Sequence, residues 1–184
     1  MYKVASLFCG CGGVDLGTIG GFTFNNKYYE KNSCRLVYAV DIEEKAILTH
    51  KANFETEKIE CADICTVNPK KDPFDDRAKL YLQMTRIVKD KQPKVFIAEN
   101  VKGLLTLKNG EIFKSVINAF EEAGYKTFYS LLCAADYGVP QKRERVIVVG
   151  IRNDIYKEKG DFVFPEKPNK NNGIPLSVAV PKLA

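Results

Sequence analysis

Short apolar runs of strand length alternate with amphipathic stretches along most of the chain. The apolar runs are rich in β-branched and aromatic residues and lie at 4–8, 36–40, 58–60, 95–98, 127–132 and 146–151. Apolar residues at helical spacing mark 14–19, 43–53, 80–88 and 112–120. This alternation predicts an α/β fold, a doubly wound and mostly parallel sheet with helices on both faces. The polar stretch 24–33 is expected to be a loop.

Composition narrows the class of protein without naming a function. The chain has 184 residues, of which 45% are hydrophobic and 28% charged, as in an ordinary globular domain. No apolar run approaches the length of a membrane span, and the N-terminus lacks the features of a signal peptide. The six cysteines show no metal-ligand spacing, so we expect no metal and reduced thiols in a cytosol. The net charge of +5 permits a nucleic-acid partner but does not require one.

Glycines follow the first predicted strand directly, at Gly10, Gly12 and Gly13. A backbone without Cβ atoms can approach a ligand closely, although a tight turn explains such glycines equally well. Asp15 occupies the position at which the third glycine of the dinucleotide fingerprint would fall, so a pyrophosphate is not required.

Other candidate ligand contacts also lie at strand ends. Asp41 ends the second strand and can accept hydrogen bonds from both hydroxyls of a ribose. Asp63, after the third strand, can accept from an adenine amine, with Ile64 against the base and Phe8 stacking on a ring. Taken singly, Asp41 could cap the following helix and Asp63 could be a turn residue. Together with the glycines they predict a site for an adenosine without a diphosphate, which fits S-adenosylmethionine.

A second set of polar residues suggests recognition of a polar ring. Glu99 ends a buried strand, where it could bind a ligand or pair with a lysine such as Lys102. Arg143 and Arg145 precede the last apolar run and would share one face of a strand, aimed at one polar edge or turned to water.

These residues belong to motifs that occur in a characteristic order. The motifs are Ser6-Leu7-Phe8-Cys9-Gly10-Cys11-Gly12-Gly13, Val40-Asp41-Ile42, Ala62-Asp63-Ile64, Glu99-Asn100-Val101 and Tyr137-Gly138-Val139-Pro140-Gln141-Lys142-Arg143-Glu144-Arg145. In this order the chain closely resembles the cytosine-C5 DNA methyltransferases over nearly its whole length.

The resemblance implies a Rossmann-like S-adenosylmethionine-dependent methyltransferase fold and a role for each motif. The resemblance implies that residues of the first three motifs, and one residue beyond them, would bind S-adenosylmethionine. The same residues would bind its product, S-adenosylhomocysteine. These residues are Phe8, Gly10, Gly12, Gly13, Asp41, Ile42, Asp63, Ile64 and Leu80. Glu99 would contact N3 and the amino group of a flipped cytosine, and Arg145 its O2, with Arg143 in support.

The sequence departs from the family in two places. The family's nucleophilic cysteine lies in a Pro-Cys-Gln segment, and none of the six cysteines here has these neighbours. The target-recognition domain is also missing, so the predicted organisation is a catalytic-type domain at 1–164, a remnant at 165–176 and a returning segment at 177–184. The chain could join pieces of a longer enzyme, which we favour, or be a truncated form or a pseudoenzyme.

The function expected from the resemblance is methyl transfer to C5 of cytosine in duplex DNA, in a bacterial restriction–modification system and in the cytosol or nucleoid. Two alternatives stay open. One is a non-catalytic cofactor-binding subunit that works with a second chain supplying the missing parts. The other is a transfer-RNA cytosine methyltransferase of the same family.

Overall fold

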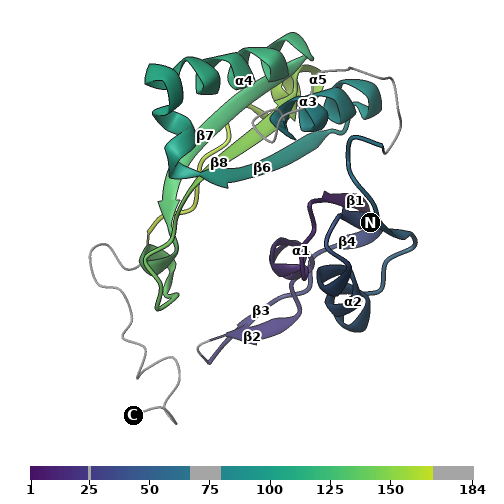
Figure 1. Ribbon diagram of the computed structural model, residues 1–184. Helices are drawn as coiled ribbons and strands as arrows, with labels where there is room; N and C mark the ends of the chain where they lie inside the picture. Colours follow the sequence, from purple (N-terminus) through teal and green to yellow (C-terminus); the bar gives the residue numbers. More distant parts are fainter. Residues whose placement is uncertain (25, 67–79, 168–184) are drawn as a thin grey trace. The chain divides into compact units, whose positions relative to one another are not determined.

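The computed structural model describes residues 1–24, 26–66 and 80–167 (Figure 1). The chain divides into two compact units, Met1–Asp76 and Arg77–Ala184, and each is described by itself. The predicted segments at 165–176 and 177–184 lie outside the described residues from residue 168 onward, so this part of the domain organisation stays a prediction.

The first unit is a small parallel sheet with two helices and a hairpin. Its elements are β1 (Tyr2–Leu7), α1 (Gly13–Ile19), β2 (Phe22–Phe24), β3 (Lys27–Tyr29), β4 (Cys34–Asp41), α2 (Glu44–Asn53) and β5 (Ile59–Cys61). The sheet order is β1-β4-β5, and both pairs are parallel. Ala39 from β4 and Ile47 from α2 are buried together with Cys9. Because parallel strands end at one edge, the residues after β1, β4 and β5 are neighbours.

The expectation of a loop at 24–33 is wrong in part, because this stretch begins within a β-hairpin. Strands β2 and β3 pair antiparallel, and the Phe22 ring stacks on Tyr29 with centroids 5.0 Å apart. Asn26 in the turn has φ +57°, a conformation that asparagine tolerates better than most residues. The three-residue strands are too short to stand out as a periodic pattern.

The second unit places a three-stranded sheet between helices. Its elements are α3 (Leu80–Lys91), β6 (Val95–Val101), α4 (Glu111–Glu122), β7 (Tyr125–Cys133), β8 (Glu144–Arg152) and α5 (Asn153–Lys159), with 3-10 helices at Lys102–Leu105, Leu107–Gly110 and Ala134–Tyr137. The order is β6-β8-β7, and β8 is antiparallel to both neighbours. Strands β6 and β7 therefore run in the same direction, and β8 is the reversed strand of this sheet.

Helices cover both faces of this second sheet (Figure 1). On one face Phe113, Val116 and Phe120 of α4 pack with Tyr125 and Val146 in a continuous apolar cluster. On the other face Phe128 of β7 lies against Tyr156 of α5.

These features confirm the predicted α/β class. The β1-β4-β5 sheet is parallel as predicted, whereas β8 pairs antiparallel with both of its neighbours. Helix α5 was not anticipated. Across the described ranges, no helix combines the length and apolar character that a bilayer span requires.

Candidate functional site

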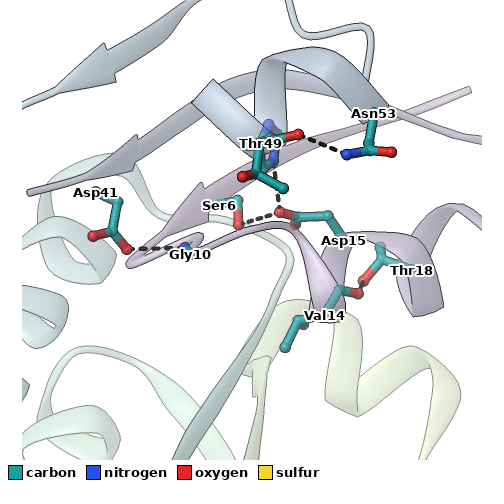
Figure 2. A network of polar contacts seen from close by, with 9 residues as sticks. Ser6, Gly10, Val14, Asp15, Thr18, Asp41, Thr49 and Asn53 are labelled. Atoms are coloured by element: carbon teal, nitrogen blue, oxygen red, sulfur yellow. Dashed lines mark hydrogen bonds and ion pairs between the residues drawn. The ribbon is translucent and has the colours of Figure 1, made fainter. Parts of the chain in front are cut away.

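The structure brings the strand-end residues of the first unit together. Gly10 donates its backbone N–H to Asp41 Oδ2 at 2.9 Å, and this contact joins the turn after β1 to the end of β4 (Figure 2). Ala62 donates its backbone N–H to the Asp41 carbonyl at 2.9 Å, which brings the end of β5 beside the same residue. The glycine turn, Asp41 and the residues before Asp63 therefore lie along one edge of one sheet.

The turn after β1 has left-handed backbone conformations at two glycines and also at Phe8, which is not a glycine. Phe8, Gly10 and Gly12 have φ of +56°, +54° and +92°. A Cβ at Gly12 would lie 2.1 Å from Cε2 of the Phe54 ring, so no larger residue fits there. A Cβ at Gly10 or Gly13, in contrast, would meet no atom of a described residue within 4 Å. Gly12 thus faces the interior, whereas Gly10 and Gly13 face open space.

Asp41 uses both of its carboxylate oxygens in local contacts. Oδ2 accepts from Gly10, and Oδ1 accepts from the backbone N–H of Glu43 at 3.0 Å. The residue that caps α2 is Glu43, whose side chain accepts from Lys45 N–H, so Asp41 is not the helix cap. Each carboxylate oxygen has two lone pairs, which leaves Asp41 the capacity to accept further hydrogen bonds.

Two isoleucines and an aspartate flank Asp41. Ile42 is 70% exposed, whereas Ile64 is only 4% exposed and belongs to the interior. Asp63 Oδ1 accepts from Cys65 N–H at 2.9 Å, which is the turn role considered for it from sequence. Of the two isoleucines, Ile42 has the exposed apolar side chain and Ile64 the buried one.

Two cysteines of the glycine turn differ sharply in their surroundings. Cys11 is exposed, but Cys9 is buried. Burial, together with the nearby charges of Asp41 and Asp15, raises the pKa of the Cys9 thiol to about 11. Since the thiolate is the nucleophilic form, Cys9 is unreactive at neutral pH.

Sequence reasoning missed a buried polar group behind the turn. Asp15 Oδ2 accepts from Ser6 Oγ at 3.0 Å and lies 3.0 Å from His50 Nε2 (Figure 2 draws the contact of Ser6 with Asp15). Asp15 is 2% exposed and His50 is completely buried. The available signals were an aspartate in place of a fingerprint glycine and the chain's single histidine.

In the second unit, Glu99 meets both predicted arginines. Arg145 Nε lies 2.5 Å from Glu99 Oε1, and Arg143 Nη2 lies 3.9 Å from the same oxygen. Arg143 directly precedes β8, which begins at Glu144, and its guanidinium group approaches the same Glu99 oxygen as that of Arg145. Lys102, the alternative partner considered for Glu99, pairs instead with Glu144 at 3.0 Å. The arrangement is a carboxylate beside two guanidinium groups at the ends of β6 and β8.

Two further predictions concern residues whose side chains or backbone the structure does not describe. Leu80 is the first residue of α3, and its side chain is not among those that the structure describes. The family's nucleophile segment would fall near 67–79, which lies outside the described residues, and the sequence there contains no cysteine.

Comparison with known proteins gives a consistent result. A sequence profile of the C-5 cytosine-specific DNA methylases matches residues 2–75 and 61–179. Type II methyltransferase M.FnuDI of Fusobacterium nucleatum is 42% identical over 91% of this chain and 53% of its own length. Type II methyltransferase M.BspRI of Lysinibacillus sphaericus is 35% identical over 92% of this chain and 48% of its own.

Solved structures agree on the fold. A prophage-encoded E. coli protein described as a DNA modification methyltransferase superposes with a TM-score of 0.71 at 26% identity, over 89% of this chain and 49% of that one. The S. pombe Dnmt2 methyltransferase superposes with a TM-score of 0.62 at 17% identity, over 92% and 58% of the two chains. The chain thus spans about half the length of the curated relatives it matches. Because the profile match spans most of its residues, the chain belongs to the C-5 cytosine-specific DNA methylase family.

Proposed function

We propose that this chain is the cofactor- and base-binding part of a DNA cytosine-C5 methyltransferase of a restriction–modification system. The observation that carries the proposal is the meeting of the glycine turn and Asp41 at the carboxyl edge of the β1-β4-β5 sheet. Ligands of open α/β sheets bind at such edges. The relatives are named Type II methyltransferases, which supports the restriction–modification assignment.

The residues of the first unit suit S-adenosylmethionine. Gly10 and Gly13 leave space at the turn, the Asp41 carboxylate can accept from ribose hydroxyls, and exposed Ile42 offers an apolar surface to adenine. When bound, this cofactor supplies an electrophilic methyl group on its sulfonium. The role of these residues is to orient the adenosine moiety, so that the methyl group has a fixed position.

The residues of the second unit suit a cytosine ring. C5 of cytosine is a poor nucleophile until a thiolate adds to C6, and negative charge then develops on the ring. In its protonated form the Glu99 carboxyl group would donate to N3 and accept from the amino group, and Arg145 would donate to O2, with Arg143 adding positive charge. The base must leave the duplex to reach them. The thiolate itself must come from outside these 184 residues or from a cysteine in another sequence context, since no Pro-Cys-Gln segment is present.

Duplex DNA is the proposed macromolecular substrate, and the net charge of +5 favours contact with phosphates. A bacterial cytosolic location, and a second chain that supplies the missing parts, stay predictions.

The decisive experiment combines mass, binding and transfer. The intact mass of the natural gene product is compared with 20.7 kDa, the mass of this sequence. S-adenosylhomocysteine binding is measured by calorimetry. Methyl-tritiated S-adenosylmethionine is then supplied with duplex DNA or with transfer RNA.

Each outcome has a definite meaning. Binding of S-adenosylhomocysteine together with label in 5-methylcytosine of DNA supports the proposal. Label in transfer RNA alone supports the transfer-RNA enzyme. A mass of 20.7 kDa with binding but no transfer supports the non-catalytic subunit. Absence of binding to the 184-residue chain contradicts the adenosine site itself.

A further inference from the structure

Buried Asp15 and His50, with partly buried Ser6, join three elements of the first unit. Ser6 lies in β1, Asp15 in the first turn of α1 and His50 near the end of α2. Asp15 Oδ2 receives both contacts, at 3.0 Å from Ser6 Oγ and 3.0 Å from His50 Nε2. A buried charged group persists only when it is well paired, so this contact ties α2 to the start of α1.

The hydrogen bonds assign the histidine tautomer. A carboxylate accepts and does not donate, so Nε2 of His50 carries the hydrogen. His50 Nδ1 is buried and has no hydrogen-bond partner among the residues that the structure describes. An unpartnered buried polar atom is costly, and a native protein that retains one usually has a reason beyond packing.

A chain of contacts leads from His50 to the glycine turn. The His50 ring lies against Phe54, with centroids 4.7 Å apart. Phe54 fills the space beside Gly12, where a Cβ would lie 2.1 Å from its ring. The same turn is held on its other side by the 2.9 Å hydrogen bond from Gly10 to Asp41. The turn is therefore held between Asp41 on one side and the Asp15–His50–Phe54 contacts on the other.

We propose that His50 is a positioning residue for the adenosine site, and this inference rests on the proposed function. Through Asp15 and Phe54 it holds the Gly10–Gly13 turn in the conformation that binds the methyl donor. A binding site made of backbone is effective only if its shape exists before the ligand arrives, because ordering it on binding weakens affinity.

The test compares three variants on one helix. His50→Leu removes the donor to Asp15, whereas His50→Gln keeps an amide N–H at a similar reach. Thr49→Ala changes an exposed residue of the same helix and is the control. For S-adenosylhomocysteine, calorimetry should show about a tenfold higher Kd in His50→Leu, a Kd near that of the unaltered chain in His50→Gln, and no loss in Thr49→Ala.

Nuclear magnetic resonance gives a second readout that needs no variant. Because the chain has a single histidine, its imidazole signals belong to His50 without ambiguity. We expect the Nε2–H tautomer in the free protein and a shift of these signals when S-adenosylhomocysteine is added. A residue that serves folding alone would show no such shift.

The outcomes separate this inference from the function it rests on. If the unaltered chain does not bind S-adenosylhomocysteine, the proposed function fails. If the unaltered chain binds and His50→Leu binds equally well, the positioning role is wrong. If His50→Leu does not fold, the imidazole signals decide, and signals unchanged by ligand overturn the inference.

Discussion

The two units of the chain differ in what they bury. Residues 77–184 enclose a continuous apolar cluster built from Phe96, Phe113, Phe120 and Tyr125 with valines of α4 and β8. Residues 1–76 enclose a much smaller apolar cluster and, beside it, the buried pair of Asp15 and His50. An apolar interior gains its stability from area removed from water, whereas a buried polar group depends on each partner being in place. The unit that carries the glycine turn is thus the one whose interior depends on individual hydrogen bonds.

Removing apolar volume from the second unit should have the largest effect. Phe120 is 1% exposed, and Phe120→Ala should lower the free energy of unfolding by about 4 kcal/mol, through lost burial and a cavity. Ile97, 57% exposed on β6, is the matched control, and Ile97→Ala should cost less than about 1 kcal/mol. Urea unfolding, followed by hydrogen exchange of the β8 amides, measures both. Equal losses would show that this unit does not depend on its apolar cluster.

The second largest loss of stability is expected when one polar partner is removed from the interior of the first unit. Asp15→Ala leaves buried His50 Nε2 and the partly buried Ser6 hydroxyl without their acceptor, and should cost about 3 kcal/mol. Hydrogen exchange of the β1 and α1 amides reports the change locally. Val14→Ala, at a site 65% exposed on the same helix, is the control. A loss no greater than in the control would mean that the polar pair does not hold this unit together.

The thiol of Cys9 tests how well the turn is shielded. With its pKa raised from the ordinary 9.0 to about 11, Cys9 should be alkylated at pH 8 about a hundredfold more slowly in the folded chain than in urea. Peptide mapping after iodoacetamide treatment measures this. A raised pKa means that the unfolded chain loses the proton first, so the Cys9 contribution to stability is complete below about pH 9 and declines as pH rises toward 11. Alkylation at the same rate in both states would place Cys9 in water.

The smallest effect of these changes is expected for Asp41→Ala, and it concerns the affinity for the cofactor. Asp41→Ala removes the acceptor for Gly10 N–H and for a ribose hydroxyl, and should raise the Kd for S-adenosylmethionine about tenfold. Asp41→Asn retains one acceptor oxygen and should lose less. Calorimetry decides, and unchanged affinity in Asp41→Ala would argue against its role in the adenosine site.

Much of the architecture was predictable because its pattern is local. Strands β4, β6 and β8 are continuous apolar runs, and α4 shows apolar residues at helical spacing, so each element appeared at nearly its observed place. The hairpin of β2 and β3 did not, since strands of three residues carry too little pattern. Helix α5 is short and polar, and it too lacked a signal.

The candidate site was predictable in its residue types but not in its contacts. The sequence predicts that Asp41 ends a strand and that Glu99 and Arg145 belong to separate motifs. The family resemblance indicates the roles of these residues. The sequence could not show that Glu99 lies 2.5 Å from Arg145, because that distance depends on the pairing of β6 with β8. Nor could it distinguish exposed Ile42 from buried Ile64, which are both apolar residues after an aspartate.

The amino-acid sequence by itself determined the order of the longer strands and helices, without the β2–β3 hairpin and α5, together with the glycine turn and the family. These follow from periodicity and motifs within short stretches of chain. Only the tertiary structure decided that Asp15 and His50, which are 35 positions apart, meet in the interior behind that turn. The physical reason is that burial and hydrogen-bond partners are set by which elements pack together, and residues distant in sequence carry no local sign of that contact.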